Sequence, residues 1–236
     1  PELIDFIMRE LVPDHMVGGH SPSIEIVEQS FLNIETPETE NHLLMIESSR
    51  YLINQIKHDQ MPDPKFDNKA NGLEGWLLGF MQTFLRHDFL EFNSRPYQRL
   101  ALHPMLNLHE FARDPVVRRA AQMVLDYTMM KFALSSSRGR RVAPYRRLQH
   151  RINHRANERN YLYASSGDQV AGFFLAYTGQ LGPDGNPARF PASLAFEGLL
   201  ASLAPYRPLP AAYILAMRQD NPPSLHRFYH GTRPIL

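Results

Sequence analysis

Residues 38–51 read ETENHLLMIESSRY, and this stretch decides how the chain folds. A polar segment changes here into an amphipathic pattern, and Thr39 stands where it can cap the first turn of a helix. Apolar residues then recur at helical spacing, so we predict a helix over residues 41–57. Its first turn carries a carboxylate, an amide and an imidazole, which are Glu40, Asn41 and His42.

Further helices are predicted on both sides of this one. Apolar periodicity places them over residues 1–11, 24–34, 72–88, 96–111, 115–134, 165–177, 192–203 and 210–217. Asp114 followed by Pro115 is a strong start signal, because Asp caps a helix well and Pro fits its first position. Long helices joined by short polar turns are typical of antiparallel helical hairpins, so we predict an all-α fold.

The composition is that of a globular protein with a substantial core. The 236 residues are 43% hydrophobic and 21% charged, and the formal net charge is +1. So small a net charge gives no global attraction to nucleic acid or to a membrane surface. No apolar run is long enough to span a bilayer. The chain has no cysteine, which excludes disulfides and thiolate chemistry.

We predict that residues 1–217 form the helical domain. Residues 218–236 are polar, rich in proline and aromatic, and show no core-forming period. They are expected to be an irregular tail or the beginning of a further C-terminal domain, such as a β-sandwich. The sequence begins with Pro, so we expect a processed or truncated N-terminus, whose targeting signal is then unknown.

Two polar corners carry residues suited to acid–base chemistry. At the first, the helix N-terminus favours anions, so Asn41 can bind a substrate carboxylate while His42 moves a proton. Capping of the helix end is the alternative reading. The second corner is EFNSRPY, residues 91–97, where Asn93 can cap the next helix and the Tyr97 phenol is a candidate proton donor or acceptor.

A basic segment follows the helix that ends near residue 134. Residues 135–141 read SSSRGRR, which predicts a flexible, basic loop, and Tyr145 lies among its arginines. Arginine suits bidentate binding of carboxylates or sulfates along a polymer. Phosphate contact and a simple solvated face are the alternatives. Nearby, His150 and His154 have the spacing of a metal pair, but the adjacent arginines would repel a cation, and we predict no metal.

Three motifs together resemble a known family. They are TENHLLM at residues 39–45, EFNSRPY at residues 91–97 and LNLHEFARDPVVRRAAQMVLDY at residues 106–127. Over residues 36–146 the chain resembles the helical domains of polysaccharide lyase-like proteins, of the heparinase II/III-like and alginate lyase-like kind. The resemblance implies antiparallel helical hairpins that form a partial or complete (α/α) toroid. One departure from the family is that Arg95 and Pro96 directly precede the tyrosine.

The resemblance also implies roles for individual residues. Asn41 would neutralise a uronate carboxylate, His42 would act or assist as base, and Tyr97 would be base or acid. Arg138 or Arg140 would stabilise the enolate-like intermediate. Substrate binding is expected from these side chains: Glu40, Glu91, Asn93, Arg95, Arg140, Arg141 and Tyr145. No cofactor is implied.

These observations favour a lyase that cleaves an acidic, uronate-containing polysaccharide by β-elimination, without establishing that the chain is an enzyme. One alternative is a glycoside hydrolase that uses Glu40, Asp88 or Glu91 as acid and base. Another is a noncatalytic helical protein that binds polyanions through residues 138–159. If the substrate is a polysaccharide, we expect a periplasmic or secreted protein.

Overall fold

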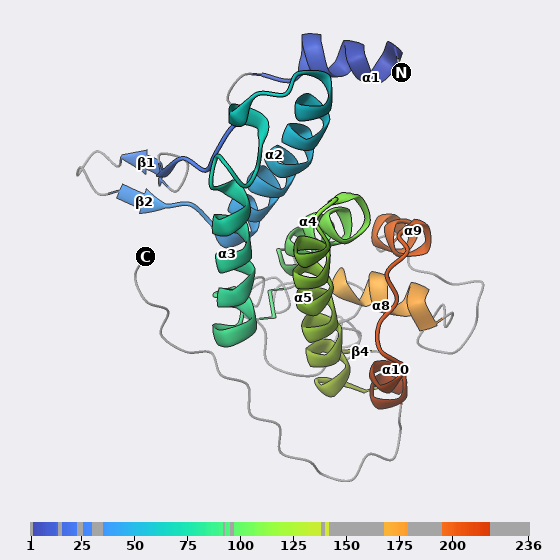
Figure 1. Ribbon diagram of the computed structural model, residues 1–236. Helices are drawn as coiled ribbons and strands as arrows, with labels where there is room; N and C mark the ends of the chain where they lie inside the picture. The colour runs from blue at the N-terminus through green and yellow to red at the C-terminus, as the bar shows by residue number, and fades with distance from the viewer. Residues whose placement is uncertain are drawn as a thin grey trace.

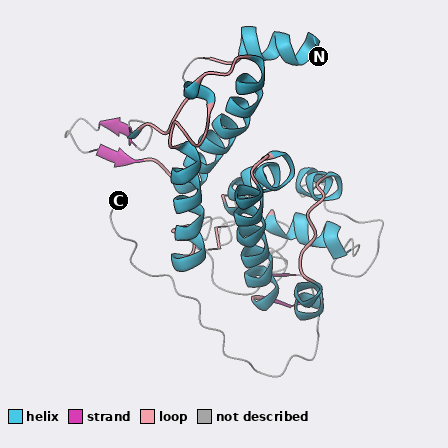
Figure 2. Cartoon of the chain, in the orientation of Figure 1, coloured by secondary structure: helices cyan, strands magenta, loops and turns pink. Residues whose placement is uncertain are grey.

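The fold is built mainly from helices, as the apolar periodicity predicts (Figures 1 and 2). The computed structural model describes residues 2–13, 16–22, 26–29, 35–91, 93–94, 97–137, 140–141, 168–178 and 195–217. The longest described helices are α2 (Glu40–Gln60), α3 (Leu73–His87), α4 (Gln98–Phe111) and α5 (Pro115–Leu134). The shorter ones are α1 (Glu2–Phe6), α8 (Val170–Thr178), α9 (Ala195–Leu203) and α10 (Pro210–Met217). None of the helices described is long and apolar enough to cross a membrane.

The predicted helices are confirmed with small shifts at their ends, except in one segment. The helix predicted over residues 24–34 is wrong, because Ile26–Gln29 is a strand, β1. It pairs antiparallel with β2 (Glu35–Pro37), and a bulge interrupts the register. The segment is rich in β-branched residues, and a short apolar run of this kind has no periodicity that separates a strand from a helix.

Local sequence explains where the central helices begin. The Asp114 carboxylate accepts a 2.7 Å hydrogen bond from the Val116 backbone N–H, and Pro115 occupies the first helical position. Thr39 occupies the cap position of α2, as predicted, but its hydroxyl donates to Glu38 and makes no bond to the helix. The start of α2 therefore depends on other contacts.

Helix α4 lies between α2 and α5, and α5 also packs against α3 and α10 (Figure 1). Helix α8 packs against α9 on the far side of α5 from α2. Beyond α2, the N-terminal α1 continues into a π-helix (Ile7–Leu11) at the edge of the molecule, where its large apolar side chains are exposed. A single turn of 3₁₀-helix (Pro64–Phe66) lies between α2 and α3.

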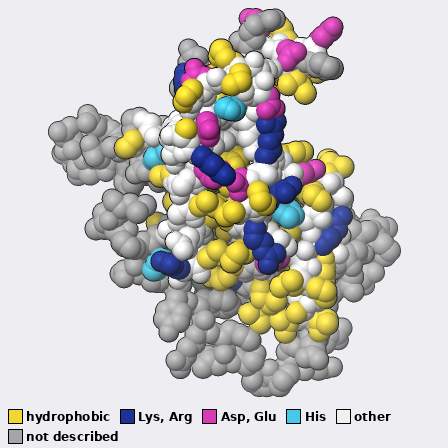
Figure 3. Space-filling model, in the orientation of Figure 1, with side chains coloured by type: hydrophobic (Ala, Val, Ile, Leu, Met, Phe, Trp, Pro, Cys, Tyr) yellow, Lys and Arg dark blue, Asp and Glu magenta, His cyan; other side chains and the backbone are white. Residues whose placement is uncertain are grey.

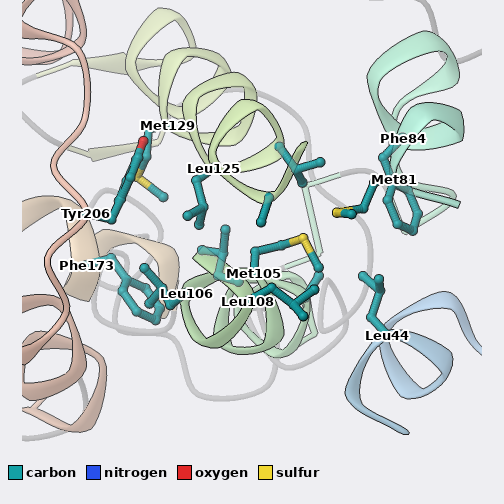
Figure 4. Close-up of a cluster of buried hydrophobic side chains, with 14 of the residues drawn as sticks. Leu44, Met81, Phe84, Met105, Leu106, Leu108, Leu125, Met129, Phe173 and Tyr206 are labelled. Atoms are coloured by element: carbon teal, nitrogen blue, oxygen red, sulfur yellow. The ribbon is translucent and has the colours of Figure 1, made fainter. Parts of the chain in front are cut away.

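One hydrophobic core joins all of the helices from α2 to α10. Figure 4 shows side chains from α2, α3, α4, α5 and α8, with Tyr206, pointing into a common interior. Met81 and Phe84 of α3 and Met105 of α4 are fully buried. The face in Figure 3 interleaves acidic and basic side chains above an area of hydrophobic ones.

The basic segment after α5 differs from its prediction as a flexible loop. Ser136–Ser137 (β3) pairs antiparallel with Arg140–Arg141 (β4) in a short ribbon. Ser135 and Ser136 donate to carbonyls of the last turn of α5, and Arg141 is buried. The prediction is wrong for these residues because a basic segment stays solvated only where no acidic side chain pairs with it, and Arg141 pairs with Asp168.

We expect Leu44→Ala to lower the free energy of unfolding by about 2–5 kcal/mol, because a cavity replaces a side chain in contact with the core. Leu44 has 0% exposure, whereas Leu199 is 56% exposed and serves as the matched control. Denaturant unfolding measures both variants. Equal losses for Leu44→Ala and Leu199→Ala would contradict this description of the core.

Candidate functional site

The two predicted corners meet through Glu40. Its Oε2 accepts a hydrogen bond from the Leu90 backbone N–H at 3.0 Å, and its Oε1 accepts one from the Glu91 N–H at 3.1 Å. Glu40 is buried, so water competes little for these bonds. The carboxylate at the first turn of α2 therefore fastens the second corner to α2.

Asp88 turns the chain into that corner at a cost in backbone strain. Its φ is 63° and its ψ is 177°, a region that is essentially restricted to glycine. Such a conformation costs on the order of 1–3 kcal/mol and persists only when surrounding contacts impose it. The Asp88 carboxylate accepts from the Phe89 N–H at 2.7 Å and from Lys131 Nζ at 2.7 and 2.8 Å.

Lys131 comes from the last turn of α5 and is buried together with Asp88. The side-chain exposures of the two residues are 1% and 0%. Burial lowers the pKa of the Lys131 ammonium from its ordinary value, although the charges of Asp88 and Glu40 act in the opposite direction. The pKa of Tyr127 is raised by burial and then by the charge and hydrogen bonding of Asp88.

Arg141 brings the basic segment to the same place. One guanidinium nitrogen donates to Asn93 at 2.9 Å and to Gln98 at 2.7 Å, both in or next to the second corner. The guanidinium also pairs with Asp168, with Nε and Oδ2 2.7 Å apart. Arg141 is thus buried in a polar network, which the sequence did not predict. We call Glu40, Asp88, Asn93, Lys131 and Arg141 the junction.

His42, two residues after Glu40, is exposed and contacts the carboxylate of Glu38. His42 Nδ1 lies 2.7 Å from Glu38 Oε2, and the side chains are 50% and 10% exposed. Burial raises the pKa of the Glu38 carboxyl, but hydrogen bonds from Thr39 and His42 outweigh it and leave the pKa below its ordinary value. A carboxylate at Nδ1 orients the ring and leaves Nε2 for a substrate.

Glu38 was not among the predicted site residues. The available signal was its spacing, because residues i and i+4 face each other on a helix and this pair straddles the start of α2. Only residues after the Thr39 cap were expected to form this part of the site. The imidazole was therefore predicted without the carboxylate that orients it.

The remaining predicted residues are placed as follows. Asn41 is buried, Tyr97 is 39% exposed at the start of α4, and Glu91 is half-buried. Asn93 has a φ of 48° and accepts from Arg141. Only the backbone of Arg140 is described, and Arg95, Arg138 and Tyr145 lie outside the described residues. The structure therefore brings the three predicted segments together, and the catalytic roles of their side chains stay predictions.

Among the described residues, no group of three or more His, Cys, Asp or Glu is placed to hold a metal ion. His150 and His154 lie outside those residues. No family model matches the chain, and no curated protein or solved structure matches it.

We expect Lys131→Met to lower the free energy of unfolding by about 3–5 kcal/mol, because it leaves the buried Asp88 carboxylate without its cation. The double variant Asp88→Asn/Lys131→Met removes both charges and should lose less than Lys131→Met alone. Lys65→Met, at an exposed lysine, is the matched control. Denaturant unfolding is the measurement. A Lys131→Met loss no greater than that of Lys65→Met would contradict the junction.

Proposed function

We propose that the chain is an enzyme that cleaves an acidic, uronate-containing polysaccharide by β-elimination, within a partial or complete (α/α) toroid. The observation that carries the proposal is the Glu38–His42 pair, with its 2.7 Å contact and half-exposed imidazole. A histidine held at Nδ1 by a carboxylate is a common form of general base. The family resemblance supplies the substrate class.

The reaction requires one proton to leave and another to arrive. In the proposed step, His42 Nε2 removes the proton from C5 of the uronate residue. The electron pair forms the C4–C5 double bond, the C4–O bond breaks, and Tyr97 gives a proton to the departing oxygen. Asn41 and Arg138 are proposed to stabilise the negative charge that the carboxylate gains as an enolate-like group.

The junction supports this assignment because it fixes the backbones that carry His42 and Tyr97. Glu40 stands two residues before His42 and binds the corner at Leu90 and Glu91. Gln98, next to Tyr97, accepts from Arg141. Buried hydrogen bonds on each side hold the two segments in a fixed relation, which proton transfer needs.

The contacts of the carboxylates favour elimination over glycoside hydrolysis. Glu40 accepts two backbone N–H groups, and Asp88 is paired with Lys131. A general acid must be placed to give a proton to the substrate, whereas these two carboxylates are engaged with groups of the protein itself. Polyanion binding without catalysis gains no support from Arg141, whose guanidinium is paired with Asp168.

We expect the full chain to convert uronate-containing polysaccharides to products with a conjugated double bond, measured as new ultraviolet absorbance. His42→Ala and Tyr97→Phe should each lower the rate by about 10²–10⁴-fold, because each removes a proton-transfer group. His87→Ala and Tyr213→Phe are the matched controls and should keep the wild-type rate. Circular dichroism verifies that all four variants are folded.

Three outcomes would overturn the proposal. New reducing ends without the absorbance would indicate a hydrolase. Full activity in His42→Ala or Tyr97→Phe would show that the assignment of these two residues as proton-transfer groups is wrong. Binding of polyuronates without any turnover would indicate a noncatalytic protein.

A further inference from the structure

A pocket of about 390 Å³ lies between the second half of α2, the segment that leads into α3, and the turn between α4 and α5. It is formed by parts of the chain other than the junction. Its size is within the range of small-ligand sites. Acidic, basic and aromatic side chains all contribute to its walls.

Two aromatic residues give the pocket an apolar side. Tyr51 and Phe66 line it, and they are only 2% and 7% exposed. The Tyr51 hydroxyl donates to Glu74 Oε2 at 3.1 Å, which fixes both side chains. Aromatic rings beside carboxylates favour a cationic ligand, because the ring faces and the acids both attract positive charge.

Two acids of the pocket, Glu74 and Asp114, are sheltered, and the lysine that pairs with them is exposed. The side chains of Glu74 and Asp114 are 12% and 14% exposed, whereas that of Lys69 is 67% exposed. Lys69 Nζ lies 2.7 Å from Asp114 and 3.7 Å from Glu74. Exposed ion pairs of a flexible lysine contribute only about 0–1 kcal/mol, so another ammonium can displace Lys69 at little cost.

His58 supplies a further polar group. It lines the same pocket, and its Nδ1 is buried with no hydrogen-bond partner in the described part of the chain. A buried polar atom without a partner is costly, so a rotation of the imidazole that turns unprotonated Nδ1 toward the pocket would let it accept from a ligand N–H group.

We propose that this pocket binds a small aliphatic diamine. One ammonium group replaces that of Lys69 between Glu74 and Asp114, and the carbon chain lies against Tyr51 and Phe66. The second amine donates to His58 Nδ1 after the imidazole has rotated toward the pocket. The carboxylates recognise the charge and the rings recognise the hydrocarbon. The proposal does not depend on the proposed lyase activity, because it uses none of the same residues.

The test is a calorimetric titration of the full chain with 1,4-diaminobutane. We expect saturable binding, and no binding of the neutral 1,4-butanediol or of succinate. Lys69→Met should bind the diamine more tightly, because it removes the resident competitor. Glu74→Gln should bind it about tenfold more weakly, since a charge-assisted hydrogen bond is lost. Glu2→Gln, at an exposed acid of α1, makes the same charge change outside the pocket and should bind as the wild type does.

The response of Lys69→Met distinguishes a cation site from an anion site and leaves the carboxylates of Glu74 and Asp114 unaltered. Weaker diamine binding in that variant would overturn the proposal. Succinate binding that Lys69→Met abolishes would assign the pocket to anions instead. Absence of diamine binding at millimolar concentration in both the wild type and Lys69→Met would also overturn it.

Discussion

The buried ion pair between Asp88 and Lys131 is the interaction on which the arrangement of the corners depends. Removing two charges from water is costly, and only close geometry with further hydrogen bonds compensates for it. Lys131 contacts both carboxylate oxygens, and Asp88 also accepts from the Phe89 N–H. These contacts hold Asp88 in a backbone conformation that a non-glycine residue rarely adopts. The turn made there directs Leu90 toward Glu40.

Helix α2 contains several buried polar residues, and they bind other segments of the chain at several points along the helix. Near its start, Glu40 holds the second corner. Further along, the buried Glu47 binds His20, and Asn54 exchanges hydrogen bonds with the backbone of Gly18. Asn68 donates to the Tyr51 carbonyl beside the pocket. Because each of these groups has a specific partner, α2 fixes loops as well as packing against other helices.

Local signals in the sequence were sufficient to predict most of the helices, whereas a site shared by the three polar segments was a hypothesis that came from the family resemblance. Asp114 and Pro115 mark the start of α5, and the apolar period of residues 41–57 marks α2. The contacts themselves were not predictable, because Asp88 and Lys131 are 43 residues apart and nothing local pairs them. Arg141 was predicted to bind substrate from a flexible basic loop, because its partner, Asp168, lies 27 residues further on and gives no local signal. Long-range pairing is set by packing, which periodicity does not reveal.

The most direct measurement of the central claim is the proximity of positions 42 and 97 in the folded chain. Because the sequence has no cysteine, a bifunctional thiol reagent can join the two thiols of His42→Cys/Tyr97→Cys selectively. A reagent that spans about 10 Å is suitable, because two residues that exchange protons with one substrate must lie close together. The account predicts rapid intramolecular cross-linking in the native protein and its loss when Lys131→Met is added. Cross-linking only after denaturation would contradict it.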